Sequence, residues 1–516
     1  MNTSAINKII AIVVGLGLGL WAVTSTMTDT MSGGIGAALR FVMVLLIPLI
    51  FARPRFGLYV LVVILANIEW VKRLAIYFGV ASVTTATEML VIPIIVLGIL
   101  VLSMFAGLVS GVHKMSVGQF GLFALSGLMI GIVLRIRGMN VYGAQAAINV
   151  GLYISMIPIL LILMKDREDF LKFMNFCALM FLPWALWGIK QYYTGLNDVE
   201  NHYVLTHISP VLSGEVLRSI GNPRPFGLAS SQASYGAIAF LSWFCIWRTL
   251  AIRRKRFGYA LLAIIYVTAL VLSGQRTALL LPFVAVPSYF LFRSKLGVIA
   301  IYTLGMFTLV LGVIYSGDLL NNLDKYQEDI AVKDGGWAEK TLKITTYSDR
   351  LRGWERLKNP EVWSLYGKKL EQSSETSQGA GVESKDYAHD IINGFLLNVG
   401  VVGLLPCLCL MGYTLYRLHA FVLRLPKGPD RQMAAAALAY SVPNLALAIM
   451  GGGNFNTTPI NFFTWTFFAM AAMAGKALIA GNVPERVIAE AALPAPPSRL
   501  RDRRRIAPEA LNALNH

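Results

Sequence analysis

Long apolar runs recur along most of the chain, with polar connections between them. Each run approaches the roughly 20 residues that an α-helix needs to cross a bilayer. The short alternating segments of a membrane β-barrel do not occur. The pattern predicts an all-α polytopic membrane protein with about 12–14 transmembrane helices. The candidate spans fall at 9–24, 35–51, 56–70, 88–110, 119–134, 141–164, 170–189, 228–250, 257–273, 276–292, 296–316, 392–416, 433–450 and 458–480.

Composition supports this prediction. Of 516 residues, 56% are hydrophobic and only 14% are charged, against about 25% charged in soluble proteins. The net charge of +17 is typical of cytoplasmic loops rich in Lys and Arg, and no nucleic-acid-binding module accompanies it. The four cysteines lie in apolar runs; Cys407 and Cys409 should point in different directions on one helix. Neither a disulfide nor a metal site is expected.

The basic residues predict an orientation. With the N-terminus inside, the inner connections include ARPR (52–55), KDRED (165–169), RSK (293–295) and RLHAFVLRLPKGPDR (417–431). The outer connections 24–34 and 451–459 contain no basic residue. The positive-inside rule therefore places both termini in the cytoplasm. The first apolar run superficially resembles a signal peptide, but we expect an uncleaved first helix.

The long polar segments define four regions. Residues 1–219 hold the N-terminal spans and a first outer loop (190–227), and residues 220–416 hold a core with a larger outer loop (317–391). Residues 417–480 hold the last two spans, and 481–516 form a basic cytoplasmic tail that is either disordered or bound to anionic lipid. Within the larger loop, SDRLRGWERL (348–357) is a plausible amphipathic helix.

Several basic residues break the positive-inside rule because they fall on the outer side. For Lys72, Arg73 and Arg218 we expect solvated or snorkelling side chains. Arg276 differs, because the short turn SGQRTALL (273–280) leaves it little freedom to snorkel. Arginine binds phosphate through a planar, bidentate fork. Arginines that converge here would form an anion site for a lipid-linked phosphate or pyrophosphate. The other outer arginines are Arg40, Arg135, Arg137, Arg224, Arg350, Arg352 and Arg356.

Three of the six histidines fall outside in this topology: His202, His207 and His389. His389 is the notable one because it starts a helix at the interface, with Asn393 one turn deeper on the same face. A neutral imidazole there can accept a proton or orient a hydroxyl near neutral pH. The alternative is a helix cap, a role for which Asp390 is better suited.

Four segments, taken in order, resemble the O-antigen ligase and polymerase superfamily of bacterial membrane glycosyltransferases. Together they cover about 220–415. One departure is that the family commonly has Asn directly after the His, where this chain has Asp390. The segments are RPFGLASSQASYGAIAFL (224–241), LVLSGQRTALLLPF (270–283), DRLRGWERLKNPEVWSLYGKKL (349–370) and HDIINGFLLNVGVVGLL (389–405).

The resemblance implies a GT-C-like fold in the bacterial inner membrane, with a periplasmic active site. Such enzymes transfer a glycan from undecaprenyl pyrophosphate to a hydroxyl, with inversion at the anomeric carbon. His389 would be the catalytic base. Arg276, Arg350, Arg224 and Arg352 would bind the donor pyrophosphate, with Asp390, Asn393 and Arg40 in support. Neither a metal nor another cofactor is expected.

The resemblance leaves the acceptor open. An exopolysaccharide or O-antigen polymerase is favoured, because a long loop and many spans suit a growing polymer. The alternatives are an O-antigen ligase to lipid A core and a protein O-oligosaccharyltransferase. A transporter of polysaccharide or lipid-linked oligosaccharide is the rival from another class. Expected partners are the lipid-linked donor, a glycan acceptor, membrane lipid and chain-length regulators or other polysaccharide-assembly proteins; nucleic acid is not expected.

Overall fold

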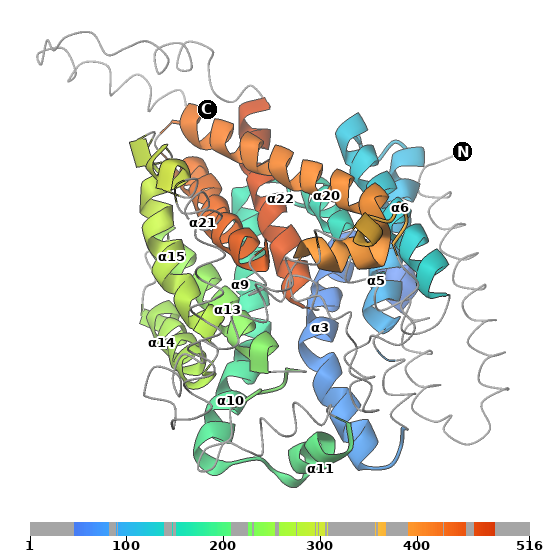
Figure 1. Cartoon of the computed structure of the whole chain (residues 1–516), viewed down its shortest axis with the longest axis vertical. Helices are drawn as coiled ribbons and strands as arrows, with labels where there is room; N and C mark the ends of the chain where they lie inside the picture. The colour runs from blue at the N-terminus through green and yellow to red at the C-terminus, as the bar shows by residue number, and fades with distance from the viewer. Residues whose placement is uncertain are drawn as a thin grey trace, which may run out of the picture.

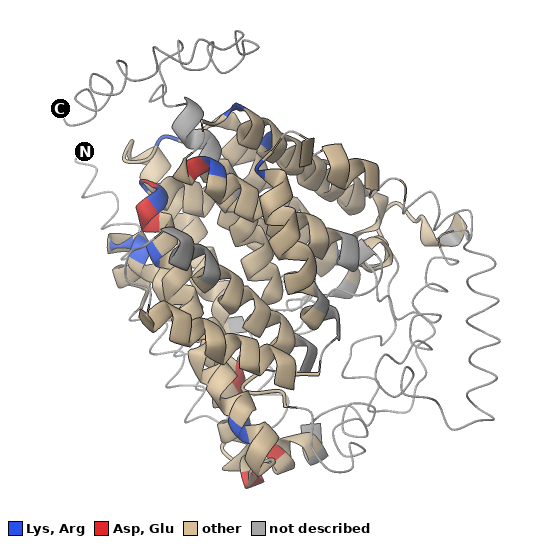
Figure 2. Ribbon diagram, turned by 90° about the vertical axis from the view of Figure 1, so that its left-hand side faces the viewer, with Lys and Arg blue, Asp and Glu red and all other residues tan. Residues whose placement is uncertain are grey.

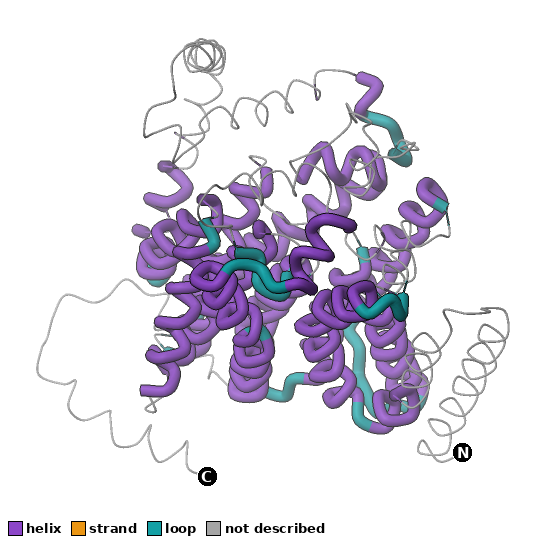
Figure 3. The backbone as a smooth tube through the Cα atoms, turned by 90° about the horizontal axis from the view of Figure 1, so that it is seen from below, coloured by secondary structure: helices purple, strands orange, loops and turns teal. Residues whose placement is uncertain are grey.

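The structure is a computed structural model of the whole chain. Every regular element that it describes is helical, and the described residues contain no strand (Figure 3). This agrees with the all-α prediction. The described residues are 46–81, 89, 91–138, 147, 151–207, 225–229, 232–252, 257–274, 276–294, 296–297, 299–304, 307, 357, 360–367, 391–426, 428–449 and 459–479.

The helices pack side by side in a bundle (Figure 1). In the N-terminal half they are α3 (Pro54–Tyr77), α5 (Val91–Val109), α6 (Val117–Arg137), η1 (Leu152–Ser155), α8 (Met156–Leu163), α9 (Arg167–Met180), α10 (Leu182–Thr194) and α11 (Asp198–His207). In the C-terminal half they are α13 (Gln232–Ile252), α14 (Phe257–Leu272), α15 (Arg276–Phe292), η3 (Pro360–Val362), α20 (Ile391–Arg424), α21 (Pro429–Ile449) and α22 (Ile460–Ile479).

Four helical stretches are long and apolar enough to cross a membrane. They are Ile92–Val109, Val117–Ile136, Arg167–Thr194 and Val399–Arg424. Shorter apolar helices accompany them at Leu152–Leu163, Ser234–Ile246, Phe257–Leu272, Leu281–Phe292 and Ile460–Met470. The described residues thus support an all-α membrane protein.

Three boundaries differ from the predicted spans. The span at 56–70 is the longer helix α3, which continues through Lys72 and Arg73 to Tyr77. The span at 170–189 is two helices, α9 and α10, which part at Phe181. Pro183 lies in the first turn of α10, where its missing N–H costs no hydrogen bond. The span at 392–416 belongs to α20, which continues to Arg424 and contains a non-helical residue, Gly400.

Around α21 the core is built on small and aromatic side chains. Tyr440 of α21 stacks on Phe467 of α22, with ring centroids 4.0 Å apart, and also lies against Phe240 and Phe244 of α13. Small residues on α21 let the neighbouring helices approach closely. These fully buried alanines are Ala434, Ala435, Ala436, Ala437 and Ala439.

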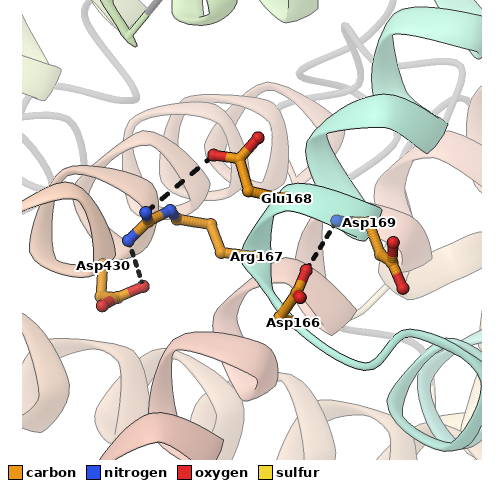
Figure 4. Close-up of polar contacts among 5 residues, drawn as sticks. All are labelled: Asp166, Arg167, Glu168, Asp169 and Asp430. Carbon is orange, nitrogen blue, oxygen red and sulfur yellow. Dashed lines mark hydrogen bonds and ion pairs between the residues drawn. The ribbon is translucent and has the colours of Figure 1, made fainter. Parts of the chain in front are cut away.

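One end of the bundle carries a network of ion pairs. Arg55, just inside α3, lies 3.2 Å from Asp169 of α9. Arg167 of α9 lies 3.0 Å from Asp430 of α21 (Figure 4), and Arg431 donates to the carbonyl of Arg293, just after α15. We call this the basic end.

The contacts at the basic end join four connections that the charge pattern predicted to share one face: 52–55, 165–169, 293–295 and 417–431. His419 of α20 also contacts the end of α15, through the ring of Phe292. Most of the described charged segments gather here, and a smaller group lies at the opposite end (Figure 2). α3 and the α9–α10 pair begin at the basic end and finish at the opposite one.

Candidate functional site

Two of the predicted site residues fall within the described helices. Arg276 is the first residue of α15, and Asn393 lies buried in the first turn of α20, 2% exposed. The side chain of Arg276 lies outside the described part. So do Arg40, Arg224, Arg350, Arg352, His389 and Asp390. Convergence of the predicted arginines with His389 therefore stays a prediction.

The turn 225–229, directly after Arg224, is described and lies on a buried polar cluster at the end opposite the basic end. The cluster comes from the ends of α3 and α10 and from α11. Its members are Glu69, Lys72, Arg73, Gln191, Glu200 and Tyr203.

The first element of the cluster is the start of α11. The side chain of Asn197 accepts a hydrogen bond from the Glu200 amide at 2.9 Å, and the Glu200 carboxylate accepts one from the Asn197 amide at 2.8 Å. This reciprocal pair satisfies two amides that a helix start otherwise leaves without partners. It also fixes the carboxylate of Glu200, whose residue is 0% exposed.

Glu200 then connects α11 to α10. Its Oε1 accepts hydrogen bonds from the Trp187 indole and from the Gln191 side-chain amide. The Trp187 ring lies 5.0 Å from the ring of Trp70 on α3. A buried carboxylate needs such donors because its desolvation otherwise costs several kcal/mol or more.

Arg73 is the centre of the cluster. The residue is 0% exposed, and its guanidinium lies over the rings of Tyr203 and Phe226 at 4.9 and 4.8 Å. Nη1 donates to the Gly227 carbonyl at 2.9 Å, and Nη2 donates to the Ala229 carbonyl. Burial lowers the pKa of Arg73 from its ordinary value, while Tyr203, Glu69 and Glu200 act in the opposite direction.

Lys72 is held on the neighbouring face of α3. Its ammonium lies 2.8 Å from the Glu69 carboxylate, and both side chains are 12% exposed. Burial by itself lowers the pKa of Lys72, but the neighbouring Glu69 carboxylate opposes it and the pKa is raised overall. The expectation of solvated or snorkelling side chains at Lys72 and Arg73 is therefore wrong. Arg218, the third residue in that expectation, lies outside the described residues.

The cluster is balanced in charge, because Glu69 and Glu200 match Lys72 and Arg73. Arg73 is engaged with protein carbonyls and aromatic rings, so it serves as a structural cation. Sequence reasoning missed this role. The available signals were the spacing of Glu69 and Lys72 (i, i+3) and the Asn197-x-x-Glu200 capping pattern.

A second feature lies at the kink in α20. At Gly400 φ is +65° and ψ is −166°, so the helix starts anew and the amides of Val401 and Val402 lack helical partners. The carbonyls of Ser364 and Leu365 accept hydrogen bonds from them, each at 3.1 Å. The end of the resembling segment 349–370 is thus docked on the helix that begins two residues after His389.

Candidate metal ligands do not cluster in the described residues. No group of three or more His, Cys, Asp or Glu that could hold a metal ion occurs there. The four cysteines are free thiols; Cys407 is buried and Cys409 exposed, which confirms that they point in different directions.

These features define an all-α chain with helices able to span a membrane and a buried polar cluster at one end. No family model matches the chain, and neither a curated protein nor a solved structure matches it. The function is therefore argued from the residues themselves.

Proposed function

We propose that the chain is a GT-C-like glycosyltransferase of the bacterial inner membrane, with 12–14 transmembrane helices and both termini in the cytoplasm. It transfers or polymerises glycan repeat units from undecaprenyl pyrophosphate at the periplasmic face. The observation that carries the proposal is the direction of two helices. α13 follows Arg224 in the sequence, and α15 begins at Arg276. Both helices start away from the basic end.

The direction of α13 follows from the turn 225–229, which is bound to the ends of α3 and α10. The direction of α15 follows from its last turn, because the Arg293 carbonyl at the basic end accepts from Arg431. α15 has 17 residues, so Arg276 begins it about 25 Å away.

Helix N-termini carry a partial positive charge and free amides, both of which favour anions. Arg276 stands at the start of α15 and Arg224 precedes the start of α13 by eight residues. Each adds a full charge with bidentate geometry. This combination suits a pyrophosphate leaving group at the depth of lipid headgroups.

The proposed reaction uses these groups directly. His389 accepts the proton of the acceptor hydroxyl as the oxygen attacks the anomeric carbon from the face opposite the pyrophosphate. The bond between that carbon and the pyrophosphate oxygen breaks, and the configuration inverts. Arg276, Arg350, Arg224 and Arg352 stabilise the charge that develops on the leaving group. The pyrophosphate leaves as an anion, so the step requires neither an acid nor a metal.

We favour polymerisation of an exopolysaccharide or O-antigen among the possible acceptors. The ligase and the protein oligosaccharyltransferase use the same donor, so residues around the pyrophosphate do not separate them. A transporter would place its polar residues on broken helices near the bilayer midplane, whereas the described polar cluster lies at one end of the bundle.

The proposal is tested by deleting the gene in its host and restoring it with variants. Arg276→Ala and His389→Ala should each lower glycan transfer about 100-fold or more, since both act on charges that form in the transition state. Arg417→Ala, a matched change at the basic end, should retain activity. Loss of a polymer ladder to single repeats indicates a polymerase; loss of core attachment with intact polymer indicates a ligase. Normal glycans in both site variants would refute the proposal.

A further inference from the structure

The turn 225–229 is held by side chains from two other helices. Gln191 Oε1 accepts hydrogen bonds from the amides of Phe226 and Gly227, at 3.0 and 2.7 Å. Gln191 Nε2 and Arg73 Nη1 both donate to the Gly227 carbonyl, at 3.2 and 2.9 Å, and Arg73 Nη2 donates to the Ala229 carbonyl. Two side chains thus bind four backbone groups within four residues.

The two side chains are themselves fixed. Glu200 accepts from Gln191 Nε2, which leaves Oε1 of the same amide directed at the turn. Arg73 lies between two aromatic rings with Glu69 and Glu200 balancing its charge. Both residues are 0% exposed, so water does not compete for their hydrogen bonds.

The backbone conformation of the turn also depends on its close packing against α10. Gly227 has a φ of +55°, and a Cβ there would lie 2.7 Å from the Trp184 carbonyl oxygen of α10. Pro225, the residue before Phe226, has its φ set by its ring and is buried. The segment that directly follows Arg224 in the sequence therefore has a fixed course, through a proline and a bound turn.

We infer that Arg73 and Gln191 are positioning residues for Arg224. They hold the turn 225–229 and thereby set where the Arg224 backbone enters the site; they do not bind the donor themselves. The predicted effect on glycan transfer rests on the proposed function. The hold of Arg73 and Gln191 on the turn does not depend on that function and is tested separately.

The geometric test is hydrogen–deuterium exchange of the purified full-length protein in detergent. Gln191→Met keeps the size of the side chain and removes the acceptor for two amides, so exchange in 226–229 should rise at least tenfold. Arg73→Lys keeps the charge but can bind only one carbonyl well, so a smaller rise is expected. Thr466→Val, which removes a buried hydroxyl bonded to Phe462, should leave the turn unchanged.

The catalytic test is a double-mutant cycle of glycan transfer. Gln191→Met should lower transfer tenfold or more, because small displacements of a charge-binding group are costly. Combined with Arg224→Ala it should add little, because both changes remove the same function. If Gln191→Met only destabilised the protein, the double variant would show the product of the two separate losses of transfer.

The outcomes separate the two proposals. Unchanged exchange in Gln191→Met, or multiplicative losses in the double variant, overturns the positioning role. A wild-type protein with no transfer activity, together with faster exchange in Gln191→Met, overturns the proposed function and supports the hold on the turn.

Discussion

Lys72 and Arg73 are adjacent in the sequence but have different partners. Successive residues of an α-helix point about 100° apart, so Lys72 pairs with Glu69 on its own helix while Arg73 reaches Tyr203, Gly227 and Ala229. The first pair could be read from the sequence as an i, i+3 spacing. The second could not, because its partners are brought to α3 only by the tertiary fold.

At the residue scale, substitution of Gly227 tests how closely the turn 225–229 approaches α10. Gly227→Ala should be strongly destabilising, because it combines a left-handed φ of +55° with a Cβ only 2.7 Å from a backbone oxygen that has no rotamer to adjust. Gly79→Ala is the matched control, with φ +67° and open space around the new Cβ; it should cost only about 1–2 kcal/mol. Apparent melting temperatures of the purified variants provide the measurement. Equal shifts would contradict the packing described at Gly227.

At the element scale, α20 behaves as two helical segments joined at Gly400. The ψ of −166° at a φ of +65° is accessible essentially only to glycine. The residue also allows close contact, since a Cβ there would lie 2.5 Å from the Leu365 carbonyl oxygen. The kink and the docking of 364–367 are therefore one feature.

Gly400→Ala should release this docked segment. The new Cβ conflicts with both the backbone conformation and Leu365, so the amides of Val401 and Val402 should lose their partners and exchange faster. Gly412→Ala in the same helix has open space and should be neutral or slightly stabilising, because Ala is the better helix former by about 1 kcal/mol. Exchange mass spectrometry of peptides covering 399–404 distinguishes the two. Protection of those amides in Gly400→Ala would show that the contact does not depend on the glycine.

The elements could be predicted from hydropathy where their boundaries coincide with a change in polarity. The predicted span 257–273 nearly matches α14, and 276–292 matches α15. Prediction was wrong at the end of α3, because buried partners allow charged residues to continue an apolar helix. The kink at Gly400 was also missed, since glycines are frequent in membrane helices and only the contact with 364–367 distinguishes this one. Of the candidate site, the sequence indicated the segments around Arg224 and Arg276 but not the buried polar cluster that holds the turn 225–229.

At the scale of the whole molecule, the two ends differ in how they use charge. The basic end joins α3, α9, α15 and α21 through arginines at helix ends. The opposite end buries two cations and two carboxylates around a single turn. This asymmetry fits the positive-inside rule if the basic end is cytoplasmic. The proposed function needs that orientation, because the arginines proposed to bind the donor must face the periplasm.

Cysteine labelling in intact cells tests the orientation. In a protein with Cys409, the exposed native thiol, changed to Ala, single cysteines are placed at Asn201 of α11 and at Ser294 after α15. Both positions are exposed and lie at opposite ends of the bundle. A membrane-impermeant maleimide should label Asn201→Cys in intact cells and Ser294→Cys only after lysis. The three buried native thiols should not react in the folded protein, because a thiol without solvent access is inert. The reverse labelling pattern would place the cluster on the cytoplasmic side, where a periplasmic glycan could not reach it. That result would contradict the proposed function. The hydrogen bonds of Arg73 and Gln191 to the turn 225–229 would be unaffected.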